Sequence, residues 1–170
     1  MKANVRSVLI FIFLGLFQVN TMAEEVKIKS NGLTLNAYLE MAEGKKLSDG
    51  VVLMTHGTLA HGQMEIMVAL QELLKEKGIN TLSITLALGL DNRHGMYDCA
   101  VPHHHKHSDA LDEIGLWVNW LKKQGATKIT LLGHSRSGNQ VPWYVEERGD
   151  PSINRVILLA PAGLMGNKSR

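Results

Sequence analysis

The segment KITLLGHSRSG, from Lys128 to Gly138, constrains the fold more than any other part of the chain. An apolar stretch typical of a buried strand runs directly into Gly133-His134-Ser135, and a segment compatible with a helix follows. This layout is that of a nucleophile elbow, a tight strand-to-helix turn that pushes a serine hydroxyl out of the sheet. The close backbones of such a turn require glycine at position 133. The second small residue expected after the serine is Ser137, with Gly138 one position later.

Ser135 is the first candidate for chemistry. A serine hydroxyl becomes an effective nucleophile when a base takes its proton and fixed donors stabilise the resulting oxyanion. At an elbow the backbone N–H of the next residue, here Arg136, supplies one such donor. His56-Gly57 stands at the end of another apolar run, and the loop after a strand in this position offers the second donor. We expect that donor to be the N–H of Thr58.

The remaining sequence predicts alternating strands and helices. Residues 26–30 and 33–39 flank the turn signal Asn31-Gly32 and predict a hairpin. Further strands are expected at 50–55, 80–86, 128–132 and 155–160, and helices at 65–77, at 109–123 and after Ser135, where Pro142 should kink or shorten the helix. This order predicts an α/β fold: a mostly parallel sheet with an N-terminal antiparallel hairpin and helices on both faces.

The apolar residues of the two longer helices predict which side faces the sheet. In the first helix the expected buried set is Ile66, Ala69, Leu70, Leu73 and Leu74. In the second helix it is Leu111, Ile114, Trp117, Val118 and Leu121. Cys99, the only cysteine, excludes an internal disulfide and is expected to be buried and inert.

A run of histidines lies in the long loop expected over residues 87–107. Adjacent side chains in a loop cannot all point at one ion, so we expect no metal site here. Loops that follow parallel strands lie at the carboxyl edge of the sheet, where ligands bind and where the elbow opens. We therefore hypothesise that the run forms part of a substrate pocket wall, through His103, His104, His105 and His107.

The N-terminal residues predict a secretory signal peptide. Lys2 and Arg6 precede the apolar run 8–17, and Ala23 marks the expected cleavage site. The run is too short for a comfortable membrane span, although an uncleaved N-terminal anchor is the alternative. We expect a signal peptide over residues 1–23, one domain over 24–170, and a periplasmic or secreted protein with no stable membrane span.

Charge and composition narrow the partners. Cleavage after Ala23 removes two basic residues and no acidic one, which leaves 16 of each in the mature chain. This balance indicates neither a nucleic-acid partner nor an anionic membrane surface. No cofactor is expected, and the oligomeric state stays open.

Taken together, the chain resembles the N-terminal part of the α/β-hydrolase superfamily. The matching pieces are the starting hairpin, the strand that ends in His56-Gly57, the elbow around Ser135, and a strand that closes in the sequence LLAPA at 158–162. The resemblance covers the chain from about Val26 onward. It implies that Ser135 is a nucleophile and that the substrate is a small-molecule ester, thioester or amide.

The resemblance also implies a triad acid and histidine after the serine, and the sequence departs from it there. No histidine follows Ser135, and the later carboxylates are Glu146, Glu147 and Asp150. Three explanations stay open. The chain is a truncated, inactive hydrolase; or it is a minimal enzyme whose base is His56, His94 or a histidine of the 103–107 run; or it is a non-catalytic exported binding protein with a metal-associated histidine loop.

Overall fold

The computed structural model describes residues 23–162, so the expected signal peptide lies almost entirely outside the described residues. Six strands form one sheet in the order β1-β2-β4-β3-β5-β6. They are β1 (Glu24–Ser30), β2 (Leu33–Glu40), β3 (Val51–Thr55), β4 (Asn80–Thr85), β5 (Ile129–His134) and β6 (Ile153–Leu159). Strand β2 runs antiparallel to β1 and β4, and the other pairs are parallel. This arrangement confirms the predicted α/β sheet with its N-terminal hairpin.

Local turn chemistry explains the hairpin. Asn31 and Gly32 both have positive φ, at 51° and 80°. A two-residue turn with this backbone matches the right-handed twist of the flanking strands, and Asn-Gly is the sequence that adopts it most readily.

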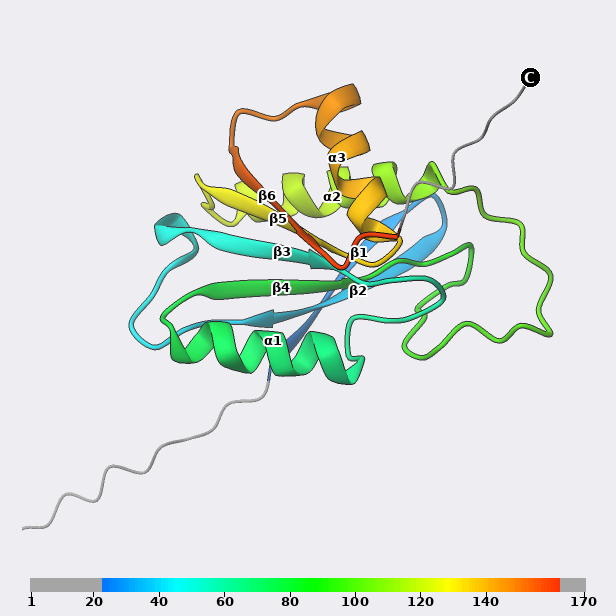
Figure 1. Cartoon of the computed structure of the whole chain (residues 1–170), viewed down its shortest axis with the longest axis horizontal. Coiled ribbons are helices and arrows are strands. Elements are labelled where there is room, and N and C mark those ends of the chain that lie inside the picture. The colour runs from blue at the N-terminus through cyan, green and yellow to red at the C-terminus, as the bar shows by residue number, and fades with distance from the viewer. Residues whose placement is uncertain (1–22, 163–170) are drawn as a thin grey trace, which may run out of the picture.

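Helices cover both faces of the sheet (Figure 1). Helix α1 (Glu65–Glu76) lies on one face, whereas α2 (Asp109–Lys123) and α3 (Ser137–Arg148) lie on the other. A short 3₁₀ turn, η1 (Leu47–Asp49), precedes β3. The long segment between β4 and α2 lies beyond the carboxyl ends of the parallel strands (Figure 1). No helix within residues 23–162 is long and apolar enough to cross a membrane.

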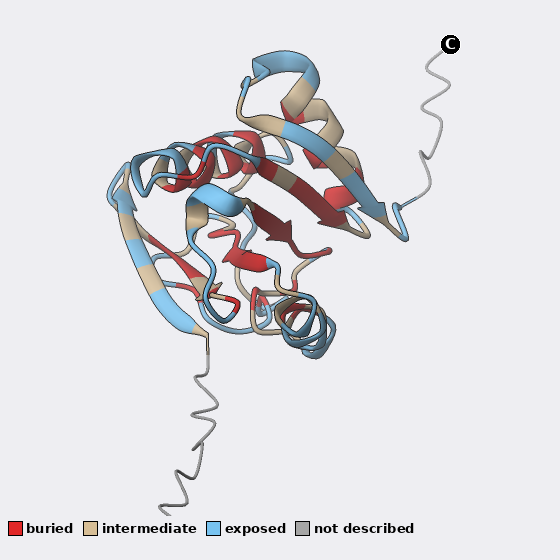
Figure 2. Ribbon diagram, turned by 90° about the vertical axis from the view of Figure 1, so that its left-hand side faces the viewer, coloured by how far each residue is buried: buried red, intermediate tan, exposed pale blue. Residues whose placement is uncertain are grey.

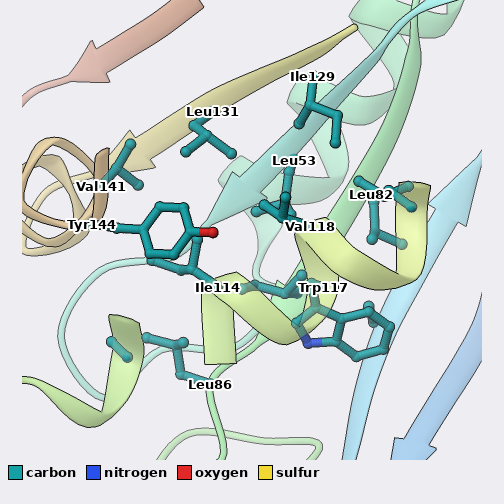
Figure 3. Close-up of a cluster of buried hydrophobic side chains, with 14 of the residues drawn as sticks. Leu53, Leu82, Leu86, Ile114, Trp117, Val118, Ile129, Leu131, Val141 and Tyr144 are labelled. Atoms are coloured by element: carbon teal, nitrogen blue, oxygen red, sulfur yellow. The ribbon is translucent and has the colours of Figure 1, made fainter. Parts of the chain in front are cut away.

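The main core lies between the sheet and α2. All five predicted apolar residues of α2 are buried, and the helix has the predicted bounds. In Figure 3, Ile114, Trp117 and Val118 of α2 point toward side chains of the central strands, among them Leu53 and Leu131. Figure 2 shows the burial concentrated in these central strands, while the edge strand β1 is largely exposed.

The predicted inner face of α1 is partly wrong. Leu70 and Leu74 do pack against the second core cluster, but Leu73 is 57% exposed, Ile66 is 38% exposed, and Ala69 is exposed as well. The helix instead turns Met67 and Gln71 inward. Gln71 can be buried because its amide donates hydrogen bonds to the Tyr38 carbonyl and the Thr81 hydroxyl.

Two other expectations concern single residues. Pro142 is expected to kink or shorten α3; the helix is not shortened there and continues to Arg148. The proline is near the start of the helix and removes only the N–H that would reach Gly138, while buried Val141 and Tyr144 on either side hold the helix on the core. Cys99 is exposed rather than buried, because it lies in the loop between β4 and α2.

Replacing Leu121 by alanine should lower the free energy of unfolding by about 2–5 kcal/mol, because the side chain is fully buried in the main core. Urea unfolding followed by circular dichroism measures this loss. Leu73→Ala, in an exposed position of α1, is the matched control and should cost about 0.5 kcal/mol or less. Equal losses in the two variants would contradict this core.

Candidate active site

Ser135 occupies a strained turn between β5 and α3. Its φ is +54°, a conformation that is uncommon for a residue with a side chain. Hydrogen bonds hold the turn on both sides. The Ser135 N–H donates to the Leu159 carbonyl at 3.0 Å, and its own carbonyl accepts from the N–H groups of Gly138 and Ala162. Strain held by surrounding contacts in this way is common at functional sites.

The two glycines near the serine are required by space. A Cβ on Gly133 would lie 2.2 Å from the Ser137 carbonyl oxygen, so this position of the elbow requires glycine. A Cβ on Gly138 would lie 2.7 Å from the Cβ of Pro161, because the chain leaving β6 crosses the start of α3. Glycine is therefore needed at 138 as well as at 133.

Ser137 takes the place of the second small residue and does more than fit. Its side chain is fully buried, and its hydroxyl lies within hydrogen-bond distance of the His56 carbonyl and Gln140 Oε1. Ser137 thus connects the first turn of α3 to the residue that follows β3. Thr58, the expected second oxyanion donor, lies in the same loop.

The loop after β3 lies directly against Ser135. A Cβ on Gly57 would lie 3.0 Å from the Ser135 Cβ and 3.4 Å from its Oγ. Leu59, next in this loop after Thr58, has a φ of +56°. Among the hydrogen bonds of residues 23–162, none uses the backbone N–H of Thr58 or of Arg136. Both expected oxyanion donors are therefore available beside the serine.

A cavity of about 120 Å³ opens beside these donors. Gly57, Thr58 and Arg136 line it. Of the four histidines expected in the pocket wall, His105 and His107 line the cavity as well, whereas His103 and His104 do not. The ring of His103 stacks on Tyr97 instead, with 4.3 Å between the ring centroids. The structure thus brings half of the run to the cavity.

His56 cannot serve as the base for Ser135. Its Nε2 accepts the Leu86 N–H at 3.0 Å, so the proton is on Nδ1, which donates to the Gly57 carbonyl at 2.8 Å. Burial lowers the pKa of His56 to about 3, which keeps the ring neutral. Both ring nitrogens are therefore used to join the loops that follow β3 and β4.

His94 lies away from the elbow. Its Nε2 is 2.6 Å from the Glu25 carboxylate, and Glu25 is on β1, at the opposite edge of the sheet from β6. The carboxylate of Asp91 likewise accepts the N–H of Thr34 at the start of β2. Three of the candidate bases, His56, His105 and His107, line the same cavity as the expected oxyanion donors, and His56 has both ring nitrogens engaged.

The structure reveals a buried arginine that sequence reasoning missed. Arg93 is 6% exposed, and its guanidinium donates to the carbonyls of Leu86, Ala60 and Gly95. It thereby connects the loop after β3 to the loop after β4. No periodicity marks residues 87–107, so no local pattern separates this arginine from a solvated one.

Glu113 of α2 is the second residue that was missed. It lines the cavity, and its Oε2 accepts the Ala87 N–H at 2.7 Å. Burial raises the pKa of its carboxyl to about 7. The only sequence signal is its spacing of one helical turn from Asp109, which also lines the cavity.

The described residues contain no group of three or more histidines, cysteines or carboxylates placed to hold a metal ion. In the histidine run, the ring of His103 stacks on Tyr97, and His107 Nδ1 lies 2.8 Å from the amide nitrogen of Gln140.

The burial of neutral His56 predicts a pH-dependent stability. The folded pKa is about 3, below the ordinary value of 6.5, so the unfolded chain binds a proton that the folded chain does not. This stability is present above pH 6.5 and is lost as the pH falls toward 3, by on the order of 1.4 kcal/mol per pH unit. Glu113, whose pKa is raised from 4.5 to about 7, changes the stability in the opposite direction between these two values. The contribution of His56 is therefore measured as the difference in slope between the parent and a His56 variant, in urea unfolding between pH 7 and pH 4.

His56→Gln removes the titrating ring. The variant should therefore be less stable than the parent at pH 7, and the two free energies of unfolding should approach each other at pH 4. His104→Gln, at an exposed position of the histidine run, should keep the parent's slope. A His56→Gln chain with the same slope as the parent would show that His56 is not the titrating group.

Solved structures of hydrolases are similar to this chain. Est1E from Butyrivibrio proteoclasticus matches with a TM-score of 0.64 and 29% identity, over 83% of this chain and 52% of Est1E. An esterase from Pyrococcus furiosus matches with a TM-score of 0.63 and 19% identity, over 82% of this chain and 50% of the esterase. Dienelactone hydrolase from Anabaena variabilis matches with a TM-score of 0.62 and 20% identity, over 83% of this chain and 65% of that enzyme.

The sequence matches no protein-family model and no curated protein. The likeness is thus carried by the structure, and the chain spans about half the length of the first two hydrolases. With its mixed sheet, its helices on both faces and its strand-to-helix turn at Ser135, the chain has an incomplete α/β-hydrolase fold, similar to the N-terminal part of that fold.

Proposed function

We propose that this protein is an exported serine hydrolase that cleaves a small-molecule ester, thioester or amide, with Ser135 as its nucleophile. One observation supports this most strongly: Ser135 stands at a strained turn beside two backbone N–H groups that the described chain leaves unpaired. An unpaired donor pair next to an elbow serine is the arrangement that stabilises an oxyanion.

The proposed reaction uses these groups in order. A base removes the proton of Ser135 Oγ as the oxygen attacks the substrate carbonyl carbon. The carbonyl oxygen becomes an oxyanion that accepts hydrogen bonds from the N–H groups of Thr58 and Arg136. Collapse of this intermediate transfers the proton from the base to the leaving group and leaves an acyl-serine. Water then attacks the acyl group while the same base takes its proton. The bond between the acyl carbon and Ser135 Oγ breaks, the base returns the proton to Oγ, and the acid is released.

A carboxylic ester is the favoured substrate within this class. Esterases are among the similar structures, and a second structure of Est1E, 30% identical to this chain, holds ferulic acid. A carboxylic acid is the product of ester, thioester and amide hydrolysis alike, so the choice of an ester rests on the esterase among the similar structures. We extend this to the present chain as a proposal about the type of bond, and leave the identity of the acid open.

The base is the missing part of the proposed machinery. His56 is engaged at both nitrogens, and His94 contacts the far edge of the sheet. His105 and His107 line the cavity, yet burial lowers the pKa of both rings, and Gln140 occupies Nδ1 of His107. We propose that residues 23–162 hold the nucleophile and oxyanion donors, that the base comes from polypeptide outside them, and that the isolated chain is inactive.

Imidazole in solution should therefore restore the reactivity of Ser135. We expect a fluorophosphonate reagent to label the folded chain slowly, and at least tenfold faster in millimolar imidazole, because the added base replaces the missing one. In-gel fluorescence measures the rate. Ser135→Ala should abolish labelling, whereas Ser48→Ala, at an exposed serine, should label as the parent does.

Fast labelling that does not depend on imidazole would place the base within the chain, and His105→Ala and His107→Ala would then identify it. No labelling of a folded chain at any imidazole concentration would contradict the assignment of Ser135 as nucleophile.

Export predicts a defined N-terminus. When the chain is produced in a bacterium with its own first residues, the protein recovered outside the cytoplasm should begin at Glu24, because the expected signal peptidase site follows Ala23. Intact-mass spectrometry of the periplasmic and secreted fractions measures this. A full-length protein retained in the cytoplasm or membrane would contradict cleavage.

A further inference from the structure

The cavity beside the oxyanion donors is placed to receive part of a substrate. Gly57, Thr58 and Arg136 line it; a Cβ on Gly57 would lie 3.0 Å from the Ser135 Cβ, and Arg136 follows Ser135 in the chain. A substrate carbonyl held by the N–H groups of Thr58 and Arg136 would therefore carry one of its two substituents into this cavity. Whatever the cavity accepts then decides which esters react.

Its size restricts that substituent to a compact group. The cavity volume is about 120 Å³, somewhat smaller than an engineered apolar cavity of about 150 Å³ that binds benzene. A single small ring or a short branched chain is of this size. A long, extended acyl chain is not.

The walls combine an apolar side with hydrogen-bonding groups. Leu59, Leu86, Leu88 and Ala110 provide the apolar contacts. On the polar side, Glu113 receives only one hydrogen bond from the described residues, from Ala87 to Oε2, so its Oε1 can accept another. His107 faces the same cavity, and because the Gln140 amide donates to its Nδ1, the ring proton is on Nε2.

The charged residues of the lining balance one another, with Lys106 and Arg136 against Asp109 and Glu113, so the cavity favours an uncharged ligand. Burial lowers the pKa of His105 and of His107, so both rings are neutral at pH 7. Burial raises the pKa of the Glu113 carboxyl, and a second negative charge beside it would be repelled. A hydroxyl fits this site better than a carboxylate, because it donates one hydrogen bond without bringing a charge into the cavity.

We propose that this cavity is a specificity site for a compact, uncharged group that carries a hydroxyl, and that the hydroxyl donates a hydrogen bond to Glu113. As a statement about substrate, this rests on the proposed hydrolase function. As a statement about binding it does not, because the cavity and its polar wall exist whether or not Ser135 reacts. Glu113 is a specificity residue in this proposal and takes no part in the proton transfers at Ser135.

Binding of phenol and of anisole to the full chain carrying Ser135→Ala tests the proposal without any reaction. The two probes share a ring, but only phenol has a hydroxyl to donate. Titrations followed by NMR should give an affinity for phenol at least tenfold higher than for anisole, with shifts at Leu86, Leu88 and Ala110. Equal affinities, or no phenol binding at these residues, would overturn the proposal.

Glu113→Gln, in the same background, tests the residue. The glutamine oxygen still accepts the Ala87 N–H, but the amide group then offers the cavity a donor in place of an acceptor. The preference for phenol over anisole should fall to about twofold or less. Glu72→Gln, at an exposed glutamate of α1, is the matched control and should leave the tenfold preference unchanged. An unchanged preference in Glu113→Gln would overturn the role of this residue.

A second variant keeps the test decisive if Glu113→Gln does not fold. Ala110 lines the cavity, so Ala110→Leu should fill it and abolish the binding of both probes. Phenol binding that survives in a folded Ala110→Leu chain would place the phenol elsewhere and overturn the proposal. Phenol selectivity in a chain whose Ser135 is not labelled at any imidazole concentration would retain the binding site and reject the hydrolase, whereas labelling without selectivity would do the reverse.

Discussion

The tight turn at Ser135 is the constraint on which the rest of the site depends. A side chain at positive φ is tolerated there because Leu159, Gly138 and Ala162 hold the backbone of the serine on both sides. The turn also brings β5, α3 and the chain leaving β6 so close together that positions 133 and 138 leave no room for a Cβ. Strand β6 therefore contributes to the site through its backbone, by fixing the direction in which the serine hydroxyl leaves the sheet. Packing of the sheet against α2 and α3 supplies the stability that sustains this strain.

A second set of contacts sets the position of the loop after β3, which contains the proposed oxyanion donor Thr58. His56 uses both ring nitrogens to join the loops after β3 and β4, and Arg93 binds carbonyls of the same two loops. Ser137 adds a contact from α3 to the His56 carbonyl. Each of these side chains is buried and polar, so each is stable only while its partners are in place. The loop after β3 is thus fixed by contacts of His56, Arg93 and Ser137. No hydrogen bond among the described residues uses the N–H of Thr58. Such preorganisation is what an oxyanion donor needs, since a fixed donor has no reorganisation to undergo during reaction.

Much of the fold could be predicted from the sequence, and the errors have identifiable causes. Helix α2 was predicted with its bounds and its buried face because its apolar residues follow a helical period without interruption. The same rule misplaced Leu73 of α1, because a buried Gln71 satisfied by Tyr38 and Thr81 replaces an apolar residue on the inner face. Pro142 predicts a kinked or shortened α3, yet the helix continues to Arg148, because packing of the buried Val141 and Tyr144 on either side outweighs the one hydrogen bond that the proline removes. In both cases a contact from a distant part of the chain overrides the local pattern.

The order of strands and helices could be predicted from the sequence, because it depends on local periodicity. The elbow at Ser135 and the glycine before it could be predicted as well, because they depend on steric limits of adjacent backbone. Only the tertiary structure decided which histidines have a role. His56 became a buried, neutral connector, His94 turned to the far edge of the sheet, and His105 and His107 reached the cavity while His103 and His104 did not. It also placed Glu113 against the loop after β4, and Arg93 between that loop and the loop after β3. These assignments depend on contacts between segments far apart in the chain, and such contacts leave no periodic signal in the residues that make them.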